Sequence, residues 1–218
     1  MQEKFFQIIN FLKYKLLARH RKGFSVHSPF VFELLNNVFF EKEHYYCYEE
    51  NEKELQKKYP KIFFRKDIKY YRLFFRLANY FNAKNMLILG NNPCVEKYLL
   101  SVSKEIMLMS FEKLDIVSES YLSKFIANNW KSLINNERDE KFDLIFFPNN
   151  SIENYKNYNL YYKENSILIF ENIYKNRKIN EIWKNICNDN SLKISIDIFR
   201  FGIIINKDIP KQHYRVAF

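Results

Sequence analysis

The sequence predicts an α/β fold in which a doubly wound, mostly parallel sheet ends in an antiparallel hairpin and is preceded by helices. Two observations predict it. Short apolar runs alternate with helical segments through the second half of the chain, which is typical of a parallel sheet covered on both faces. Near the C-terminus, the runs 192–199 and 201–206 have almost nothing between them, so they must pair antiparallel.

The N-terminal part, residues 1–66, is predicted to be helical and to pack on an α/β domain formed by residues 67–218. An apolar stripe with helical spacing lies within residues 2–19 and consists of Phe5, Ile9, Leu12 and Leu16. Lysines lie among these residues, and a basic amphipathic helix can also lie on a membrane surface. Packing on the domain is the commoner arrangement, and we expect it here.

Local signals place the next three helices. Ser28 and Pro29 are the residues expected at the cap and first position of a helix, which predicts a helix over about 28–40. A short helix is predicted near 48–58, and another over 68–82.

The predicted strands of the parallel sheet are four short apolar runs at 85–90, 105–109, 142–147 and 166–170. Helices are predicted between and after them at about 94–101, within 117–136, at about 151–163 and at about 177–189.

The chain is basic, with 35 Lys and Arg against 25 Asp and Glu and a net charge of +10. Such a balance occurs in proteins that bind nucleic acid or anionic membranes. The lysines are spread along the whole chain, with one denser cluster from Lys13 to Lys22, so we favour an ordinary solvated surface and keep a polyanionic partner as the alternative.

Cysteine usage and hydropathy predict the compartment. Cys47, Cys94 and Cys187 lie far apart and form no CxxC pair, which argues against a disulfide framework or a zinc site. No stretch approaches the roughly 18 uncharged apolar residues of a membrane span. We therefore expect a cytoplasmic protein without a membrane span.

Several segments, in order along the chain, match the pattern of a known family. They are RKGFSVHSPFVFELL (21–35), HYYCYEE (44–50), RLFFRLANYFNAKNMLILG (72–90), FDLIFFPNN (142–150), SILIFENIY (166–174) and DIFRFGIIINKDIPKQHYRVAF (197–218). In them the chain resembles a divergent member of a bacterial, Bacteroidetes-type family of class I S-adenosylmethionine (SAM) dependent methyltransferases that carries an N-terminal helical HSPFVF block. The resemblance implies a Rossmann-like class I methyltransferase fold, SAM as cofactor and methyl transfer to an acceptor.

In this family the loop after the first strand is glycine-rich, because the backbone must approach the methionine part of SAM. Gly90 occupies the first glycine position, but Asn91, Asn92 and Pro93 follow where small residues are expected. Asn tolerates left-handed backbone angles, whereas Pro93 removes an amide donor and stiffens the loop. We therefore expect a degenerate loop that still turns, with Gly90 and Asn91 nearest the cofactor, but that crowds SAM.

Two more residues are assigned to the cofactor by the resemblance. Glu112 is the candidate for the acid that accepts hydrogen bonds from the ribose hydroxyls, and an exposed acid at the start of a loop is its equally weighted alternative. After the run 142–147 the family has Asp-Gly-Asn, whereas this chain has Pro148, Asn149 and Asn150. Asn149 remains a candidate cofactor contact, and the carboxylate is lost.

Three residues are weak candidates for substrate contacts. After the run 166–170, Glu171 retains one charge of the family's acidic pair, and Tyr174 replaces an imidazole that could act as a base. His27 could touch a substrate or, as we favour, bond to the backbone at a helix entry. One Glu and a few Asn do not form a convincing site for a hard cation, so we expect no metal.

Methyl transfer from a sulfonium needs mostly alignment and little acid–base help, so the loss of a base does not exclude activity. Loss of the SAM-binding loop, by contrast, would nearly exclude activity. The leading hypothesis is a SAM-dependent methyltransferase that acts on an unidentified acceptor, with weak or lost activity. The alternatives are a catalytically inactive methyltransferase-like binding or scaffold protein and a basic, aromatic-rich RNA-binding relative.

Overall fold

The computed structural model describes most of the chain, namely residues 2–18, 26–110, 141–148, 151–153, 155 and 161–218. The helices are α1 (Gln2–Leu17), α2 (Pro29–Leu34), α3 (Cys47–Lys58), α4 (Ile68–Tyr80), α5 (Pro93–Leu100) and α7 (Arg177–Asn188). Two short helical turns complete this set, a π turn η2 (Leu35–Phe39) and a 3-10 turn η3 (Arg65–Asp67).

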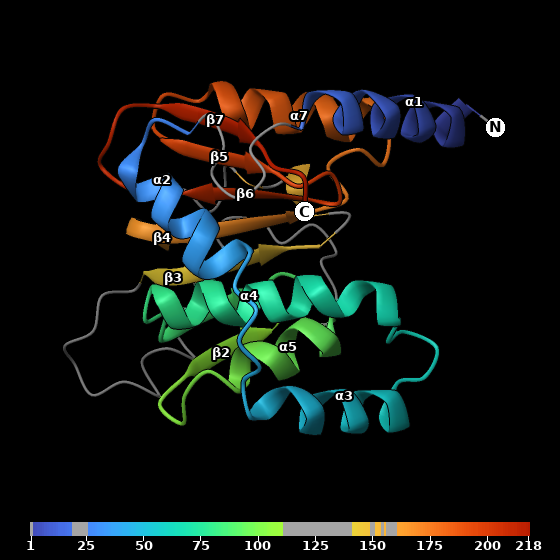
Figure 1. Cartoon of the computed structure of the whole chain (residues 1–218), viewed down its shortest axis with the longest axis vertical. Helices are drawn as coiled ribbons and strands as arrows, with labels where there is room; N and C mark the ends of the chain where they lie inside the picture. The colour runs from blue at the N-terminus through green and yellow to red at the C-terminus, as the bar shows by residue number, and fades with distance from the viewer. Residues whose placement is uncertain (1, 19–25, 111–140, 149–150, 154, 156–160) are drawn as a thin grey trace, which may run out of the picture.

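Within the described residues, seven strands form one sheet in the order β2-β1-β3-β4-β6-β5-β7 (Figure 1). Their bounds are β1 (Asn85–Ile88), β2 (Met107–Ser110), β3 (Phe142–Phe147), β4 (Tyr162–Glu171), β5 (Ile194–Asp197), β6 (Phe201–Ile205) and β7 (Gln212–Arg215). The first four strands run parallel, and β6 pairs antiparallel with both β4 and β5. This confirms the predicted parallel sheet with a C-terminal antiparallel hairpin.

The structure differs from the predicted elements in two places. Strand β4 begins at Tyr162, where a helix over about 151–163 was expected, and it is therefore longer than the apolar run 166–170 that predicted it. Strand β7 was not predicted; it pairs parallel with β5 at the sheet edge. The helix expected within 117–136 lies outside the described residues.

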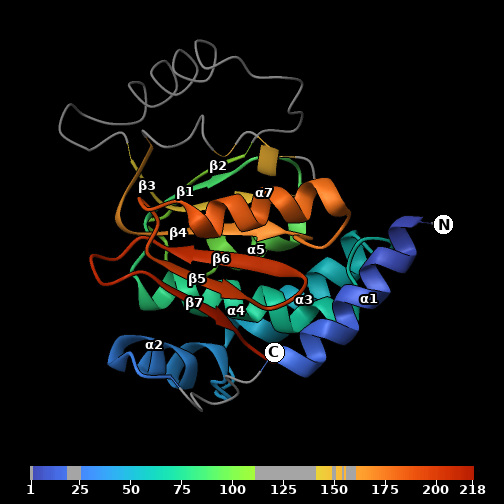
Figure 2. The same ribbon diagram turned by 90° about the horizontal axis from the view of Figure 1, so that it is seen from above.

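The helices cover both faces of the sheet, as Figure 2 shows from above. Helices α2 to α5 contribute to the hydrophobic cluster on one face and α7 to the cluster on the other. Strand β6 serves both clusters, since Ile203 and Ile205 belong to the first and Ile204 to the second. Ile203, Ile204 and Ile205 are all fully buried.

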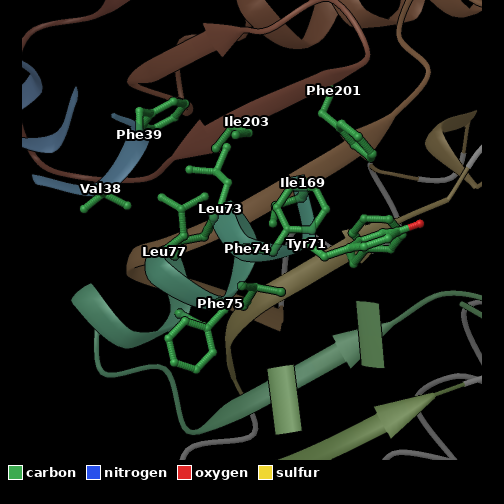
Figure 3. Packing of buried hydrophobic residues seen from close by; sticks show 14 of the residues in the cluster. Val38, Phe39, Tyr71, Leu73, Phe74, Phe75, Leu77, Ile169, Phe201 and Ile203 are labelled. Carbon is green, nitrogen blue, oxygen red and sulfur yellow. The ribbon is translucent and has the colours of Figure 1, made fainter. Parts of the chain in front are cut away.

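The segment from α2 to η2 packs tightly on α4. Helix α2 starts as predicted, with the Ser28 hydroxyl accepting a bond from the Val31 amide at 3.4 Å and Pro29 in the first helical position. Figure 3 shows Val38 and Phe39 of η2 beside Leu73 and Leu77 of α4, close to the β6 strand.

The buried side chain of Arg76 also fastens this segment to α4. Its Nε donates to the Val38 carbonyl at 2.6 Å, and its second nitrogen donates to the Phe39 carbonyl at 3.2 Å. These bonds satisfy two carbonyls at the end of the π turn, where helix ends otherwise leave acceptors unpaired.

Helix α1 forms as predicted, but its apolar stripe does not pack on the domain. Phe5, Leu12 and Leu16 are exposed, Ile9 is half-buried, and Tyr14 is the buried residue of this helix. The expectation of a packed stripe was therefore wrong for α1. Among the described helices, none is long and apolar enough to cross a membrane. The domain boundary at residue 66 remains a prediction.

Candidate functional site

The carboxyl ends of the parallel strands meet along one edge of the sheet. Strand β2 follows β1 in sequence and lies on one side of it in the sheet, whereas β3, the next strand in sequence, lies on the other side of β1. The strand order therefore reverses at β1. In open α/β sheets, ligands bind at such a switch point, in the crevice outside the carboxyl ends of the strands. Gly90 follows β1 and Pro148 follows β3, so these two residues border the switch point.

Gly90 has two structural reasons to be glycine. Its φ angle is +148°, which side-chain-bearing residues rarely adopt. A Cβ atom placed on it would lie 2.8 Å from Cγ of Pro148. The ring of Pro148 therefore covers this side of Gly90.

The residues after Gly90 begin helix α5. Asn92 is its N-cap, and the side-chain oxygen accepts a bond from the Val95 amide at 3.2 Å. Pro93 occupies the first helical position, where the missing N–H has no intrahelical partner to lose. The residues that we interpreted as a degenerate cofactor loop therefore also form a regular helix start, and Asn91 is exposed just before it.

A cleft of about 650 Å³ lies at the same edge of the sheet, farther along toward β6. It is formed by the start of α4, the loop after β4, the β5–β6 turn and one residue of α1. Its lining residues are Gln7, Lys66, Asp67, Lys69, Tyr70, Asn172, Tyr174, Lys175, Phe199 and Arg200. Four cations and one carboxylate thus share the cleft with three aromatic rings.

Comparison with solved structures identifies the fold. A candidate caffeoyl-CoA O-methyltransferase from Staphylococcus aureus is similar at 16% identity and a TM-score of 0.51, over 74% of this chain and 93% of that one. The chain has the fold of a class I methyltransferase.

Further solved structures with lower scores include the O-methyltransferase TomG from Streptomyces achromogenes in complex with SAM. It is 11% identical with a TM-score of 0.49, over 82% of this chain and 95% of that one. An O-methyltransferase from Bacillus cereus in complex with SAH is 14% identical with a TM-score of 0.47, over 75% and 90% of the two chains. No family model matches the chain, and no curated protein matches its sequence.

Within this methyltransferase fold, the predicted site residues fall into three groups. Gly90, Asn91 and Tyr174 follow strands and Glu171 ends β4, all at the carboxyl edge of the sheet, where ligands bind in open α/β folds. Glu112 and Asn149 lie outside the described residues. His27 is exposed and lies beside Gln212, the first residue of β7, at the opposite edge of the sheet. The structure therefore does not bring His27 together with Glu171 and Tyr174.

Arg200 is the central cation of the cleft. Its guanidinium pairs with the carboxylate of Asp67 at the start of α4 and lies 3.9 Å from the carboxylate of Glu171 at the end of β4. The side chain of Asp67 is buried against Arg200. The partners are 133 residues apart in sequence, so no local pattern could show the pair.

Tyr174 is held in place by a buried carboxylate. Its hydroxyl donates to Oδ2 of Asp197 at 2.5 Å, and Nε of Arg215 donates to the same oxygen at 3.2 Å. Burial and the nearby charge of Asp197 both raise the pKa of Tyr174. The phenol therefore stays protonated at neutral pH, so it acts as a hydrogen-bond donor and is unsuited to the role of base.

Lys69 also borders the cleft. Its ammonium group donates to the Phe218 carbonyl at 2.9 Å and lies 4.8 Å from the centre of the Tyr70 ring. Burial lowers the pKa of Lys69. The ammonium group of Lys69 therefore makes a cation–π contact with Tyr70 at the border of the cleft.

Proposed function

We propose that this chain is a SAM-dependent methyltransferase that binds SAM weakly beside Gly90 and takes an anionic acceptor into the cleft around Arg200. The observation that supports the proposal is this cleft, which lies at the carboxyl edge of a methyltransferase fold. The acceptor class follows from the lining, which has four cations against one carboxylate and three aromatic side chains.

Beside the switch point, the backbone conformation of Gly90 supports SAM binding, whereas Pro148 leaves SAM little room. Gly90 holds the unusual backbone angle that allows close approach, and the exposed Asn91 continues the loop. Pro148 takes up space next to Gly90. We therefore expect binding that is weakened rather than lost.

When bound, SAM supplies an electrophilic methyl group, so the protein has mainly to align the acceptor atom. The cations Lys66, Lys69 and Arg200 hold an anionic acceptor and favour its ionised, nucleophilic form. This matters because Tyr174 remains protonated and does not serve as a base. An acceptor with an ionised oxygen or sulfur needs no base from the protein.

The decisive experiment is calorimetric titration of the chain with SAM and with S-adenosylhomocysteine. We expect weak binding by the unmodified protein and about tenfold tighter binding by the Pro148→Ala variant, since its shorter side chain opens the crevice. Pro210→Ala is the matched control, because Pro210 is exposed at the opposite edge of the sheet, beside His27.

The outcomes separate the functions. Binding that strengthens only in the Pro148→Ala variant supports a methyltransferase with a narrowed cofactor site. If neither nucleoside binds the unmodified protein or either variant, the chain is a methyltransferase-like binding protein and the proposal is wrong.

A further inference from the structure

Helix α1 turns its apolar side away from the protein. Its most exposed large residues follow one another along one side of the helix and are Phe5 (67% exposed), Ile8 (57%), Leu12 (56%) and Leu16 (78%). Because a helix has about 3.6 residues per turn, their spacing of three or four places them in one row, which we call the α1 face. The N-terminal end of α1 also projects from the rest of the molecule (Figures 1 and 2).

Specific contacts hold the helix in this orientation. The side-chain amide of Gln7 donates to the Lys175 carbonyl at 2.8 Å, and the Tyr14 hydroxyl donates to the Val216 carbonyl. The Tyr14 ring also packs on Phe199, with 5.3 Å between ring centres. Rolling α1 to bury its apolar residues would break these contacts. The outward orientation of the α1 face is therefore a built feature of the fold.

A groove of about 840 Å³ lies between α1 and α7. Its cations come from both helices and are Lys13, Arg177, Lys178 and Lys184. Phe5, Phe6 and Ile9 give it an apolar side, and Glu3 is the one carboxylate among its lining residues. Cations therefore lie directly beside exposed apolar residues, which is the arrangement of helices that bind membrane surfaces.

Two further lysines border the α1 face. Lys4 and Lys15 lie on one flank of the row and Lys13 lies on the other, as their positions on a regular helix require. Anionic lipids attract such basic residues to the bilayer surface, while the apolar row enters the boundary between headgroups and acyl chains. We propose that the α1 face and the α1–α7 groove bind the surface of an anionic lipid bilayer.

Charge decides between this occupant and a second copy of the chain. A second copy also carries a net charge of +10, and pairing through the same surface would bring the lysines of one copy against those of the other. An anionic bilayer offers the opposite charge together with an apolar interior.

The test is flotation of the full-length chain with vesicles of phosphatidylcholine mixed with phosphatidylglycerol, and with vesicles of phosphatidylcholine alone. We expect at least about tenfold stronger binding to the anionic vesicles, weakened by high salt. Replacing Phe5, Leu12 and Leu16 by Ser should reduce the binding at least about tenfold. These side chains are exposed, so the thermal melting of the variant should stay unchanged.

The matched control replaces three other exposed apolar residues, Tyr46, Ile62 and Phe64, by Ser. Tyr46 precedes α3, at the end of the molecule opposite α1 (Figure 1), and Ile62 and Phe64 lie in the loop that follows α3, outside the α1 face and the α1–α7 groove, so vesicle binding should not change. The proposal is overturned if the chain does not bind anionic vesicles or if both triple variants bind equally well. It is also overturned if sedimentation equilibrium shows a dimer that only the α1 variant loses, since the occupant would then be a second copy.

Discussion

Replacing Gly202 by Ala should destabilise the protein through a single contact. Gly202 lies in the middle of the sheet, where it pairs with Phe170 of β4 and Asp197 of β5. A Cβ atom at this position would lie 2.5 Å from Cη2 and Cζ3 of Trp183. Trp183 is buried on α7 and packs on Phe170, with 5.9 Å between ring centres.

The expected magnitude follows from these distances. Ordinary contacts of a Cβ atom begin at 3.4 Å, so the Trp183 ring or strand β6 must move by the difference from 2.5 Å, 0.9 Å. Overpacking a well-packed core typically costs about 1–3 kcal/mol, and a rigid ring against a central strand places this case near 3 kcal/mol. Urea denaturation measures the loss as a lower midpoint with an unchanged slope.

A double-mutant cycle tests whether the contact with Trp183 is the cause. In a Trp183→Leu background the ring is gone, so Gly202→Ala should cost less than about 1 kcal/mol. Equal costs in the two backgrounds, or a cost below about 0.5 kcal/mol in the unmodified chain, would refute the reasoning.

Three other predictions rest on burial. Ile204→Ala should lower the free energy of unfolding by about 2–4 kcal/mol in urea, and a cost under 0.5 kcal/mol would mean that the hairpin is peripheral. Arg200→Ala should cost about 2–4 kcal/mol because it leaves the buried Asp67 carboxylate unpaired, and calorimetric melting should show that Arg200→Lys loses less. Burial raises the pKa of the Cys94 thiol from 9.0 to about 11, so stability is retained below pH 9 and should fall as the pH rises toward about 11. If the melting temperature of the Cys94→Ala variant falls with rising alkaline pH as much as that of the unmodified chain, Cys94 is not the cause of the loss.

Most of the described strands and helices, though not β7 or the first part of β4, could be predicted from the sequence because burial leaves a local pattern. Apolar runs such as 142–147 became buried parallel strands, and the short link between 192–199 and 201–206 required an antiparallel hairpin. Gly202 illustrates the limit. It lies in the predicted run 201–206, but no local pattern shows that the Trp183 ring, on α7, fills the space where its side chain would be.

Helix α1 shows a second limit of sequence patterns. The periodicity correctly predicted a helix with an apolar row, but periodicity does not say which side of a helix meets the protein. That side is selected by long-range contacts, such as the bond from Tyr14 to the Val216 carbonyl, 202 residues away in sequence.

Gly90 shows why a motif glycine is weak evidence for a cofactor. The loop conformation alone requires it, because its φ is +148°, and packing requires it again, because Pro148 occupies the position of a side chain. Both reasons hold whether or not SAM binds. Pro148 differs from Gly90 in this respect, because the backbone conformation of Gly90 does not depend on a proline ring at position 148. The effect of Pro148→Ala on SAM affinity therefore tests the cofactor site more directly than any substitution of Gly90, which would disturb the fold and the site together.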